Sequence, residues 1–263
     1  MTMQTVRDYM SELVDWVEAD ARLPEVQERL EELDVSALAV LDAQGNPAGV
    51  ISRTDLIRAG RVGPREGRRH RLLSLPDDRV RSVMATRVVA VGPDDALEVA
   101  ARKMVKERMH RLFVLDQGRP VGVFSTFDAM QAVQDRRIQT SLGALMHTSM
   151  VVVEASAPVS LAVDRMTAAH IHAVVVVDSE WPIGIFAQAD ALAVRDVPPE
   201  TKVEEWMDVA ILCLPVGMAA HRAAAHALAM DVEQVLVMND EGACGIVSAL
   251  DFTRALFEAP KGD

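Results

Sequence analysis

The sequence predicts an α/β (α+β) fold made of four repeats of about 60 residues, each with the element order β-α-β-β-α. One motif carries most of this prediction: a glycine, two apolar residues, a small residue, two variable positions and an aspartate. We call it the closing motif, and its copies occupy residues 49–55, 122–128, 184–190 and 245–251. The closing aspartates Asp55, Asp128, Asp190 and Asp251 are spaced by 73, 62 and 61 residues.

Two further landmarks recur in phase with the closing motif. A methionine opens each repeat, with gaps of 74, 62 and 61 residues, at Met10, Met84, Met146 and Met207. A run rich in β-forming residues ends near Asp42, Asp116, Asp178 and Asn239. Three landmarks in register are hard to obtain by chance, so the period indicates repeated structural units.

The element order follows from the second repeat. Val88 to Val91 is a short β-forming run, and Pro93-Asp94-Asp95 is typical of a helix start, because acidic side chains are stabilised at a helix N-terminus. A helix is expected next, since apolar residues recur at the spacing of one helix face. These residues are Leu97, Ala100, Ala101, Met104 and Val105.

The rest of the second repeat predicts a hairpin and a closing helix. Leu112 to Leu115 is a strand, residues 117–120 form the turn, and Val121 to Phe124 is the returning strand. Ser125 to Val133 is the closing helix. The first repeat matches, with Ala39 to Leu41 as a strand, Gly45-Asn46 at the hairpin turn, and one helix face made of Leu23, Val26, Leu30 and Leu33.

A sheet this small cannot bury its apolar face alone, so the repeats are expected to pair. An inserted basic segment separates the first two. Residues 58–71 contain six arginines and His70 against the single acid Glu66, without apolar periodicity. Three interpretations stand: a solvated disordered loop, a contact with phosphate or a partner, and a nucleic-acid contact. The segment lacks the aromatic residues that stack on bases.

These repeats resemble the cystathionine-β-synthase-type (CBS) domain. The resemblance rests on the β-α-β-β-α unit closed by Gly-apolar-x-Ser/Thr-x-x-Asp, and it covers residues 5–258. It implies four CBS repeats paired into two pseudo-twofold modules, called Bateman modules, with clefts between repeats that hold adenine nucleotides. The first module would span 1–138, with repeats at 5–60 and 80–138 around the basic loop 61–71. The second would span 139–263, with repeats at 139–197 and 201–259.

The resemblance also assigns ligand roles. The closing aspartates match a carboxylate that accepts hydrogen bonds from ribose hydroxyls, and an ionised acceptor makes the stronger bond. The serines three residues earlier match a phosphate contact at a helix N-terminus. The third repeat departs from this pattern, because it carries Ala187. The complete expected ligand-binding set is Ser52, Arg53, Asp55, Arg87, His110, Arg111, Ser125, Asp128, Asp190, Ser248 and Asp251.

The first module is expected to hold the main sites. His110 and Arg111 stand directly before the central strand of the second repeat, and Arg111 offers bidentate recognition of phosphate oxygens. In the second module the matching places are Ile171-His172 and Glu233-Gln234, and Glu233 would repel a phosphate. A structural interpretation stands beside the functional one, because a serine followed three residues later by an acid is also a helix capping box.

Composition limits the function classes. Half of the 263 residues are hydrophobic, which supports packed cores, and no apolar run approaches the roughly 20 residues of a membrane-spanning helix. The N-terminal residues lack the features of a secretory signal, so a cytoplasmic location is expected. A net charge of −12 disfavours nucleic acid and anionic membranes. Cys213 and Cys244 are interpreted as buried thiols, and Trp16, Trp181 and Trp206 as packing residues.

The expected function is that of a regulatory sensor protein, not an enzyme. It would bind AMP, ADP or ATP, ahead of S-adenosylmethionine or a cyclic dinucleotide, and so modulate an unidentified partner protein or its own assembly, including a homodimer. No cofactor and no metal are expected. Local constellations of paired carboxylates, nucleophiles or metal ligands are missing from the sequence. The alternative is a ligand-free scaffold that mediates oligomerisation or protein–protein interaction.

Overall fold

The computed structural model describes residues 4–12, 15–60 and 73–258, and most of the basic segment 58–71 lies outside these residues. The chain divides into two compact units, each assembled from separated stretches of sequence. Unit 1 comprises Met1–Val14, Val88–Ser149 and Leu212–Asp263. Unit 2 comprises Asp15–Arg87 and Met150–Ile211.

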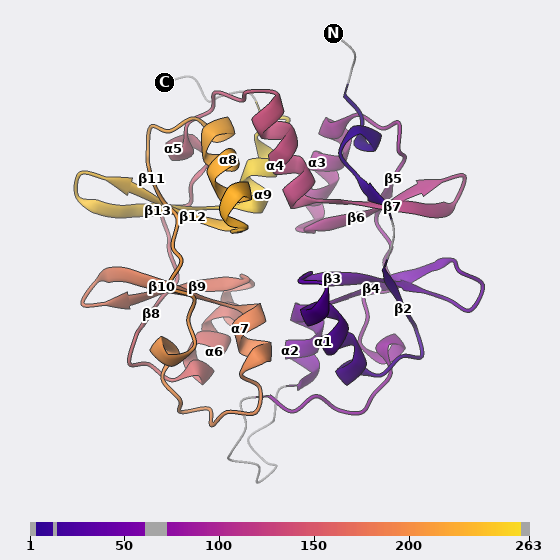
Figure 1. The fold of residues 1–263 in the computed structure, drawn as a ribbon, viewed down its shortest axis with the longest axis horizontal. Coiled ribbons are helices and arrows are strands. Elements are labelled where there is room, and N and C mark those ends of the chain that lie inside the picture. Colours follow the sequence, from indigo (N-terminus) through magenta and orange to yellow (C-terminus); the bar gives the residue numbers. More distant parts are fainter. Residues whose placement is uncertain (1–3, 13–14, 61–72, 259–263) are drawn as a thin grey trace. The chain divides into compact units, whose positions relative to one another are not determined.

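Unit 1 contains two sheets and a layer of helices (Figure 1). One sheet has the order β1-β7-β6-β5, with β1 at Ser11–Glu12, β7 at Arg119–Ser125, β6 at Arg111–Asp116 and β5 at Ala90–Val91. The other has the order β11-β12-β13, at Cys213–Pro215, Gln234–Asn239 and Gly242–Ser248. The helices are η1 (Val6–Asp8), α3 (Leu97–Glu107), α4 (Thr126–Asp135), α5 (Leu142–Leu145), α8 (Ala220–Met230) and α9 (Ala249–Arg254).

Unit 2 is built in the same way. Its sheets have the orders β2-β3-β4, at Trp16–Glu18, Ala37–Leu41 and Pro47–Ser52, and β10-β9-β8, at Trp181–Ala187, Ala173–Asp178 and Val152–Glu154. Its helices are α1 (Leu23–Glu32), α2 (Arg53–Gly60), η2 (Val80–Ser82), α6 (Val159–Ala169), α7 (Gln188–Ala193) and η3 (Val203–Glu205).

The predicted α/β fold is confirmed, and the β-α-β-β-α order recurs along the described chain. In each repeat a short strand pairs in parallel with the strand that follows the first helix, and that strand pairs in antiparallel with the next one. A helix is the usual connection between parallel neighbours, because the chain must return to the same end of the sheet. The hairpin turn predicted over residues 117–120 is shorter in the structure, because β7 already begins at Arg119. Its two residues Gln117 and Gly118 have φ angles of 48° and 80°, which match the right-handed strand twist.

The start of α3 differs from the prediction. The helix begins at Leu97, after the Pro93-Asp94-Asp95 segment. The carbonyl oxygens of Pro93 and Asp95 instead accept hydrogen bonds from the backbone N–H groups of Arg7 and Val6, at 2.8 and 3.0 Å. The segment is a turn, closed by a hydrogen bond of 3.2 Å from the Asp95 N–H to the Gly92 carbonyl oxygen, and the backbone of η1 holds it in place from far away in the sequence.

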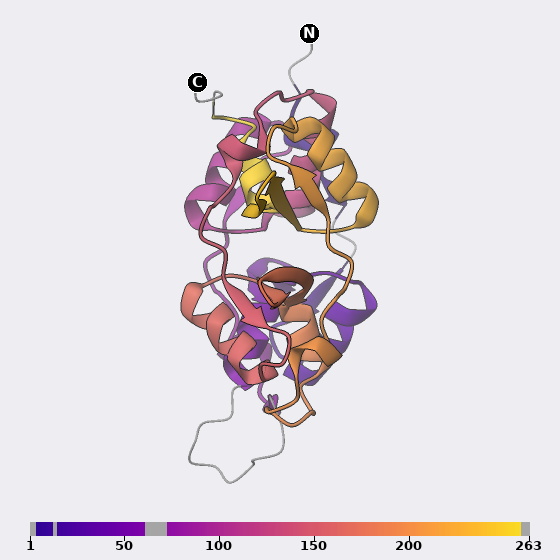
Figure 2. The same ribbon diagram turned by 90° about the vertical axis from the view of Figure 1, so that its left-hand side faces the viewer.

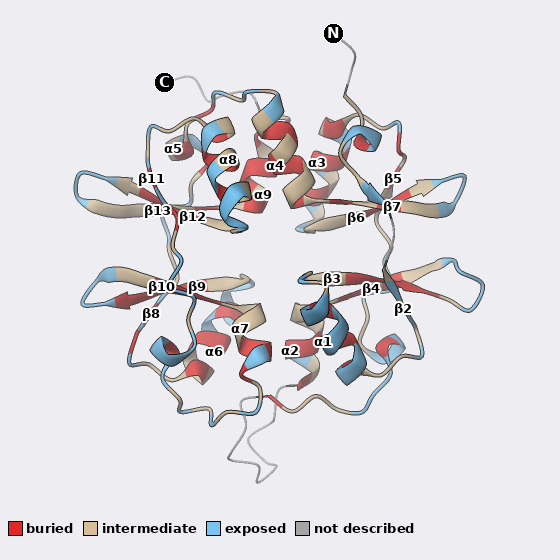
Figure 3. Ribbon diagram, viewed as in Figure 1, coloured by how far each residue is buried: buried red, intermediate tan, exposed pale blue. Residues whose placement is uncertain are grey.

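The cores lie between helices and sheets. On α3 the face predicted from periodicity is buried at Leu97, Ala100, Ala101 and Met104, whereas Val105 is half-buried. Figure 3 shows the buried residues concentrated on the strands and on the inward faces of the helices. In unit 1, α4 packs against α8 and α9, and α3 packs against α9. Figure 2 shows these orange and yellow helices beside the magenta helices of residues 97–135.

The segment after each opening methionine pairs with the hairpin of a different repeat. Ser11 pairs with Val123, Ala85 with Val50, His147 with Ile246, and Asp208 with Ile185. The first and second repeats thus exchange these segments with each other, and so do the third repeat and residues 201–259. We call them exchanged segments.

Two sequence landmarks meet at these exchanged segments. A Cβ atom added to Gly122 would lie 2.6 Å from the carbonyl oxygen of Ser11 and 3.1 Å from Sδ of Met10. Gly49 stands in the same relation to Met84, Gly184 to Met207, and Gly245 to Met146. The closing-motif glycine is therefore required for close approach of the exchanged backbone, and the opening methionine covers it.

Two packing interpretations were wrong. Trp16, Trp181 and Trp206 are 49%, 67% and 43% exposed, because Trp16 and Trp181 stand at strand starts and Trp206 follows η3, outside the buried faces. Cys213 is exposed and Cys244 only half-buried. The division into modules 1–138 and 139–263 stays a prediction. No described helix is long and apolar enough to cross a membrane.

Candidate functional site

The closing motif has one local geometry. The strand ends at the small residue, the helix begins at the next residue, and the aspartate is the third helical residue. Oδ2 of Asp128 accepts hydrogen bonds from the Ser125 backbone N–H at 2.7 Å and from its hydroxyl at 2.8 Å. Ser52 and Asp55 do the same at 3.0 and 2.6 Å. Oδ2 caps the strand-to-helix turn, so Oδ1 is the atom that this capping box leaves for other donors.

In the second repeat the structure brings three predicted residues together. Arg111 opens β6 directly opposite Ser125 at the end of β7. Burial raises the pKa of Asp128, whereas hydrogen bonds from Ser125 and the nearby charge of Arg111 lower it. His110 stands one residue earlier, and its carbonyl oxygen accepts the backbone N–H of Thr126 at 3.0 Å. A half-buried carboxylate, a hydroxyl and a guanidinium thus share one end of a hairpin.

In the first repeat the cationic groups have protein partners. Arg53 lies 3.4 Å from an oxygen of Asp34, and Arg58 lies 3.5 Å from Oδ1 of Asp55. Ala37 occupies the place opposite Ser52 that Arg111 occupies in the second repeat. Arg87, predicted near the second repeat, belongs to unit 2 and follows Ala85 on the segment exchanged into the first repeat's sheet.

In the third repeat the predicted serine is replaced and the carboxylate has an acidic neighbour. The Ala187 backbone N–H donates to Oδ2 of Asp190 at 2.7 Å. Burial raises the pKa of Asp190; the Ala187 hydrogen bond lowers it, the negative charge of Asp208 raises it further, and the positive charge of Arg53 lowers it.

The register also corrects one match made from sequence. The first helical N–H bonds to the carbonyl oxygen of His110 in the second repeat and of His172 in the third. Ala173 then pairs with Ala187 as Arg111 pairs with Ser125. The counterpart of His110-Arg111 is therefore His172-Ala173, not Ile171-His172. The match was wrong by one residue because it was made from the sequence alone, which does not show which residues pair across the two strands.

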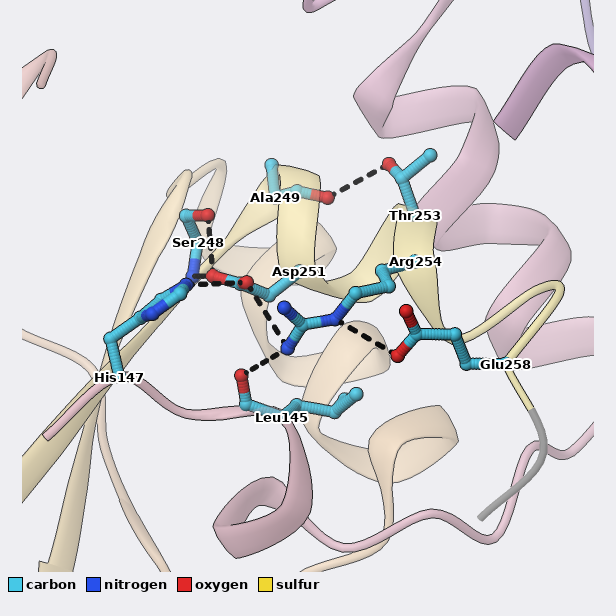
Figure 4. A network of polar contacts seen from close by, with 8 residues as sticks. All are labelled: Leu145, His147, Ser248, Ala249, Asp251, Thr253, Arg254 and Glu258. Carbon is cyan, nitrogen blue, oxygen red and sulfur yellow. Dashed lines mark hydrogen bonds and ion pairs between the residues drawn. The ribbon is translucent and has the colours of Figure 1, made fainter. Parts of the chain in front are cut away.

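The last closing motif is occupied from within the protein (Figure 4). Oδ2 of Asp251 accepts from the Ser248 backbone N–H at 2.9 Å and from its hydroxyl at 2.7 Å. Oδ1 lies 2.9 Å from Nε2 of His147 and 3.4 Å from a guanidinium nitrogen of Arg254. That same nitrogen donates to the carbonyl oxygen of Leu145 at 2.7 Å. Asp251 is only 5% exposed, whereas the other three closing aspartates are half-buried.

His147 and Asp208 are the residues that sequence reasoning missed. Each directly follows an opening methionine, so the signal was present, but nothing local shows that this position reaches the closing motif of another repeat. A separate pocket of about 520 Å³ in unit 1 contains Arg102, Arg136 and Phe257 in its lining and holds none of the predicted site residues.

The site can accept donors at Oδ1 and place an anion near Arg111. A carboxylate is a strong acceptor for ligand hydroxyls, and a guanidinium binds phosphate or carboxylate oxygens in a bidentate way. Within unit 1 the second repeat offers both groups, whereas at Asp251 the protein supplies the donors itself. The four motifs share a backbone geometry but differ in the chemistry they offer.

Comparisons with known proteins agree with this architecture. The model of the CBS domain matches residues 6–61, 80–135 and 142–196. A CBS domain-containing protein of Bacillus subtilis, YhcV, is 24% identical over 149 residues, which is 56% of this chain and 99% of that protein.

Two crystal structures share the fold over almost the whole chain. One is a Methanocaldococcus jannaschii protein described as a proposed archaeal homologue of g-AMPK, with a TM-score of 0.83, 14% identity, and coverage of 96% of this chain and all of that one. The other is a conserved Pyrococcus horikoshii protein, with a TM-score of 0.67, 20% identity and the same coverage. Because the family model matches more than half of its residues, the chain belongs to the CBS domain family.

Proposed function

We propose that this chain is a non-catalytic regulatory protein that binds adenine nucleotide at the closing motifs of its first two repeats and thereby modulates a partner protein or its own assembly. The observation that carries the proposal is the cluster of Arg111, Ser125 and Asp128. It combines an acceptor for ribose hydroxyls with a cation for phosphate at one end of a hairpin.

The proposal includes four CBS repeats in two Bateman modules. The element order of residues 201–259 supports a fourth repeat. Their opening methionine Met207 contacts Gly184, and their closing-motif glycine Gly245 contacts Met146, as in the other repeats. The reciprocal exchange of segments supports pairing of the first repeat with the second, and of the third with the fourth. The cytoplasmic location and the homodimer stay predictions.

Isothermal titration of the full chain with AMP, ADP, ATP and S-adenosylmethionine tests the proposal. We expect binding of at least one adenine nucleotide. Asp128→Asn keeps a side-chain oxygen to cap α4 but removes the charge, so we expect affinity about 10- to 100-fold lower, since hydrogen bonds to charged groups contribute about 1.5–3 kcal/mol.

The matched control is Asp116→Asn, the same substitution at an exposed position at the end of β6, and it should bind as the wild type does. A flat titration of the wild-type protein with every ligand at millimolar concentration would reject nucleotide binding.

A ligand-free scaffold is the second candidate, and the last closing motif favours it. The Asp251 carboxylate is already in contact with Ser248, His147 and Arg254. In the third repeat, Ala187 replaces the serine, so its closing motif lacks the hydroxyl group. Should the titration be flat while the purified protein still assembles into a defined oligomer, this role would replace the sensor role.

A further inference from the structure

One residue position differs in chemistry among the four repeats while keeping the same place in the fold. It directly follows the opening methionine and pairs with the residue two places before the small residue of a closing motif. We call it the exchange position. The exchange position is Ser11 at the closing motif of Asp128, Ala85 at that of Asp55, Asp208 at that of Asp190 and His147 at that of Asp251.

At the exchange position of Asp251, a histidine contacts Oδ1, the carboxylate oxygen that is not used by the capping box. Nε2 of His147 lies 2.9 Å from Oδ1, and His147 is itself exposed, with 60% of its side chain accessible. Its carboxylate partner is 6% accessible. A ligand hydroxyl that is to bind Oδ1 must therefore first displace the imidazole.

Arg254 does not by itself explain this occupancy. It stands three residues after Asp251 and lies 3.4 Å from Oδ1, as Arg58 stands three residues after Asp55 and lies 3.5 Å from its Oδ1. Asp55 remains half-buried, with Ala85 at its exchange position. The two motifs differ in the imidazole and in the burial of the arginine, because the Arg254 side chain is 23% accessible and that of Arg58 is 72%.

At the exchange position of Asp190, the residue is an aspartate, Asp208, where the motif of Asp251 has the imidazole of His147. Asp208 is exposed, and its backbone N–H and carbonyl pair with Ile185 at 2.8 Å in both directions. A like charge beside Asp190 repels an anionic ligand. Only at Ser11 and Ala85 are small, uncharged side chains found at this position.

We propose that the exchange position selects which closing aspartates accept a ligand hydroxyl: Ser11 and Ala85 place neither an imidazole nor a charge beside Asp128 and Asp55, whereas His147 occupies Asp251 and Asp208 repels anionic ligands from Asp190. The selection rests on the proposed function, because it takes the hydroxyl groups of a nucleotide as the incoming donors. In this proposal, the choice of ligand-binding aspartate depends on a residue of one repeat that lies beside the closing motif of another repeat.

Reciprocal substitutions in the full chain test the selection by isothermal titration with AMP, ADP and ATP. His147→Ser copies Ser11 and should add one binding event per chain to the wild-type stoichiometry. Ser11→His copies His147 and should remove the binding event that Asp128→Asn weakens. The control is His226→Ser, which changes an exposed histidine on α8 and should leave the titration as in the wild type.

A second measurement uses no nucleotide. If His147 binds Asp251, His147→Ser lowers the Tm of the wild-type protein but not that of the Asp251→Asn variant, whereas His226→Ser has the same effect in both backgrounds. Equal Tm losses for His147→Ser in the two backgrounds would overturn the contact.

The outcomes separate the two proposals. A wild-type protein that binds no nucleotide sinks the proposed function. If the wild-type protein binds nucleotide but the stoichiometry is unchanged in either His147→Ser or Ser11→His, only the proposed role of the exchange position is rejected.

Discussion

Each closing aspartate is held in place by hydrogen bonds and at the same time partly removed from water. For Asp128 burial is the largest influence, and it raises the pKa despite two hydrogen bonds from Ser125 and the charge of Arg111. Asp190 is affected in the same direction. A carboxylate buried in this way is thus costly to ionise, since low polarity disfavours the charged form.

This cost predicts an unusual dependence of stability on pH. The pKa of Asp128 is higher in the folded state than the roughly 3.9 of an unfolded aspartate, so the folded state binds the proton more tightly. Its contribution to the free energy of unfolding is therefore fully present below that unfolded value and is lost as pH rises through the raised pKa. Urea unfolding of the wild type and Asp128→Asn across this range should show the wild type losing stability relative to the variant as pH rises.

Asp42 provides a control of opposite sign. Its pKa is lowered, first by the backbone N–H of Asn46 and further by the Asn46 side chain and other backbone groups of the turn. Its contribution is present above the unfolded pKa and lost as pH falls, so the wild type should gain stability relative to Asp42→Asn as pH rises. Parallel slopes for the two pairs would contradict the assignment of Asp128.

At the scale of elements, the exchanged segments explain why methionine and glycine recur. Gly122 lets the backbone of Ser11 lie against β7, and Met10 covers the contact. The same arrangement is found for Gly49, Gly184 and Gly245. These short segments are only a few residues long, so their pairing depends on backbone approach and not on a long ladder of hydrogen bonds.

Gly122→Ala should therefore destabilise unit 1. The added Cβ would lie 2.6 Å from a backbone oxygen that cannot rotate away, and overpacking typically costs about 1–3 kcal/mol. Gly217→Ala is the matched control, because no heavy atom lies within 4 Å of its added Cβ. Urea unfolding measures both; equal stability of the two variants would show that the exchanged segment is not tightly packed.

At the scale of the whole molecule, each compact unit is completed by residues distant in sequence. In unit 1 the apolar residues of α4 pack with those of α8 and α9, which begin 94 and 123 residues after α4 begins. In unit 2, α2 packs with α7. Thr54 and Gln188 add a hydrogen bond of 3.0 Å between α2 and α7. A piece of the chain that ends before α6 leaves these helix faces without their partners.

A fragment of residues 1–138 is therefore expected to self-associate. It would expose the faces of α2 and α4 that contact α7, α8 and α9 in the full chain, and exposed apolar patches drive association. Light scattering over a range of concentrations measures the mass. A fragment that stays monomeric and unfolds cooperatively at every concentration would contradict this and would support 1–138 as a self-sufficient module.

Most of the local structure could be predicted from the sequence. The buried face of α3 at Leu97 and Ala100, the turn at Gln117-Gly118 and the start of α4 after Ser125 all follow from helical periodicity, turn chemistry and capping. These features depend on residues within a few positions of one another. The repeat and the closing aspartates belong to the same class of information.

Contacts between repeats were decided by the tertiary structure alone. His147 and Asp251 are 104 residues apart, and neither has a neighbour that indicates the other. The one-residue shift at His172 depends on strand pairing, and the turn before α3 depends on hydrogen bonds from η1. The sequence by itself determined the repeated unit, because periodicity and capping act locally; the tertiary structure decided which donor reaches each carboxylate, because that depends on how distant segments pair.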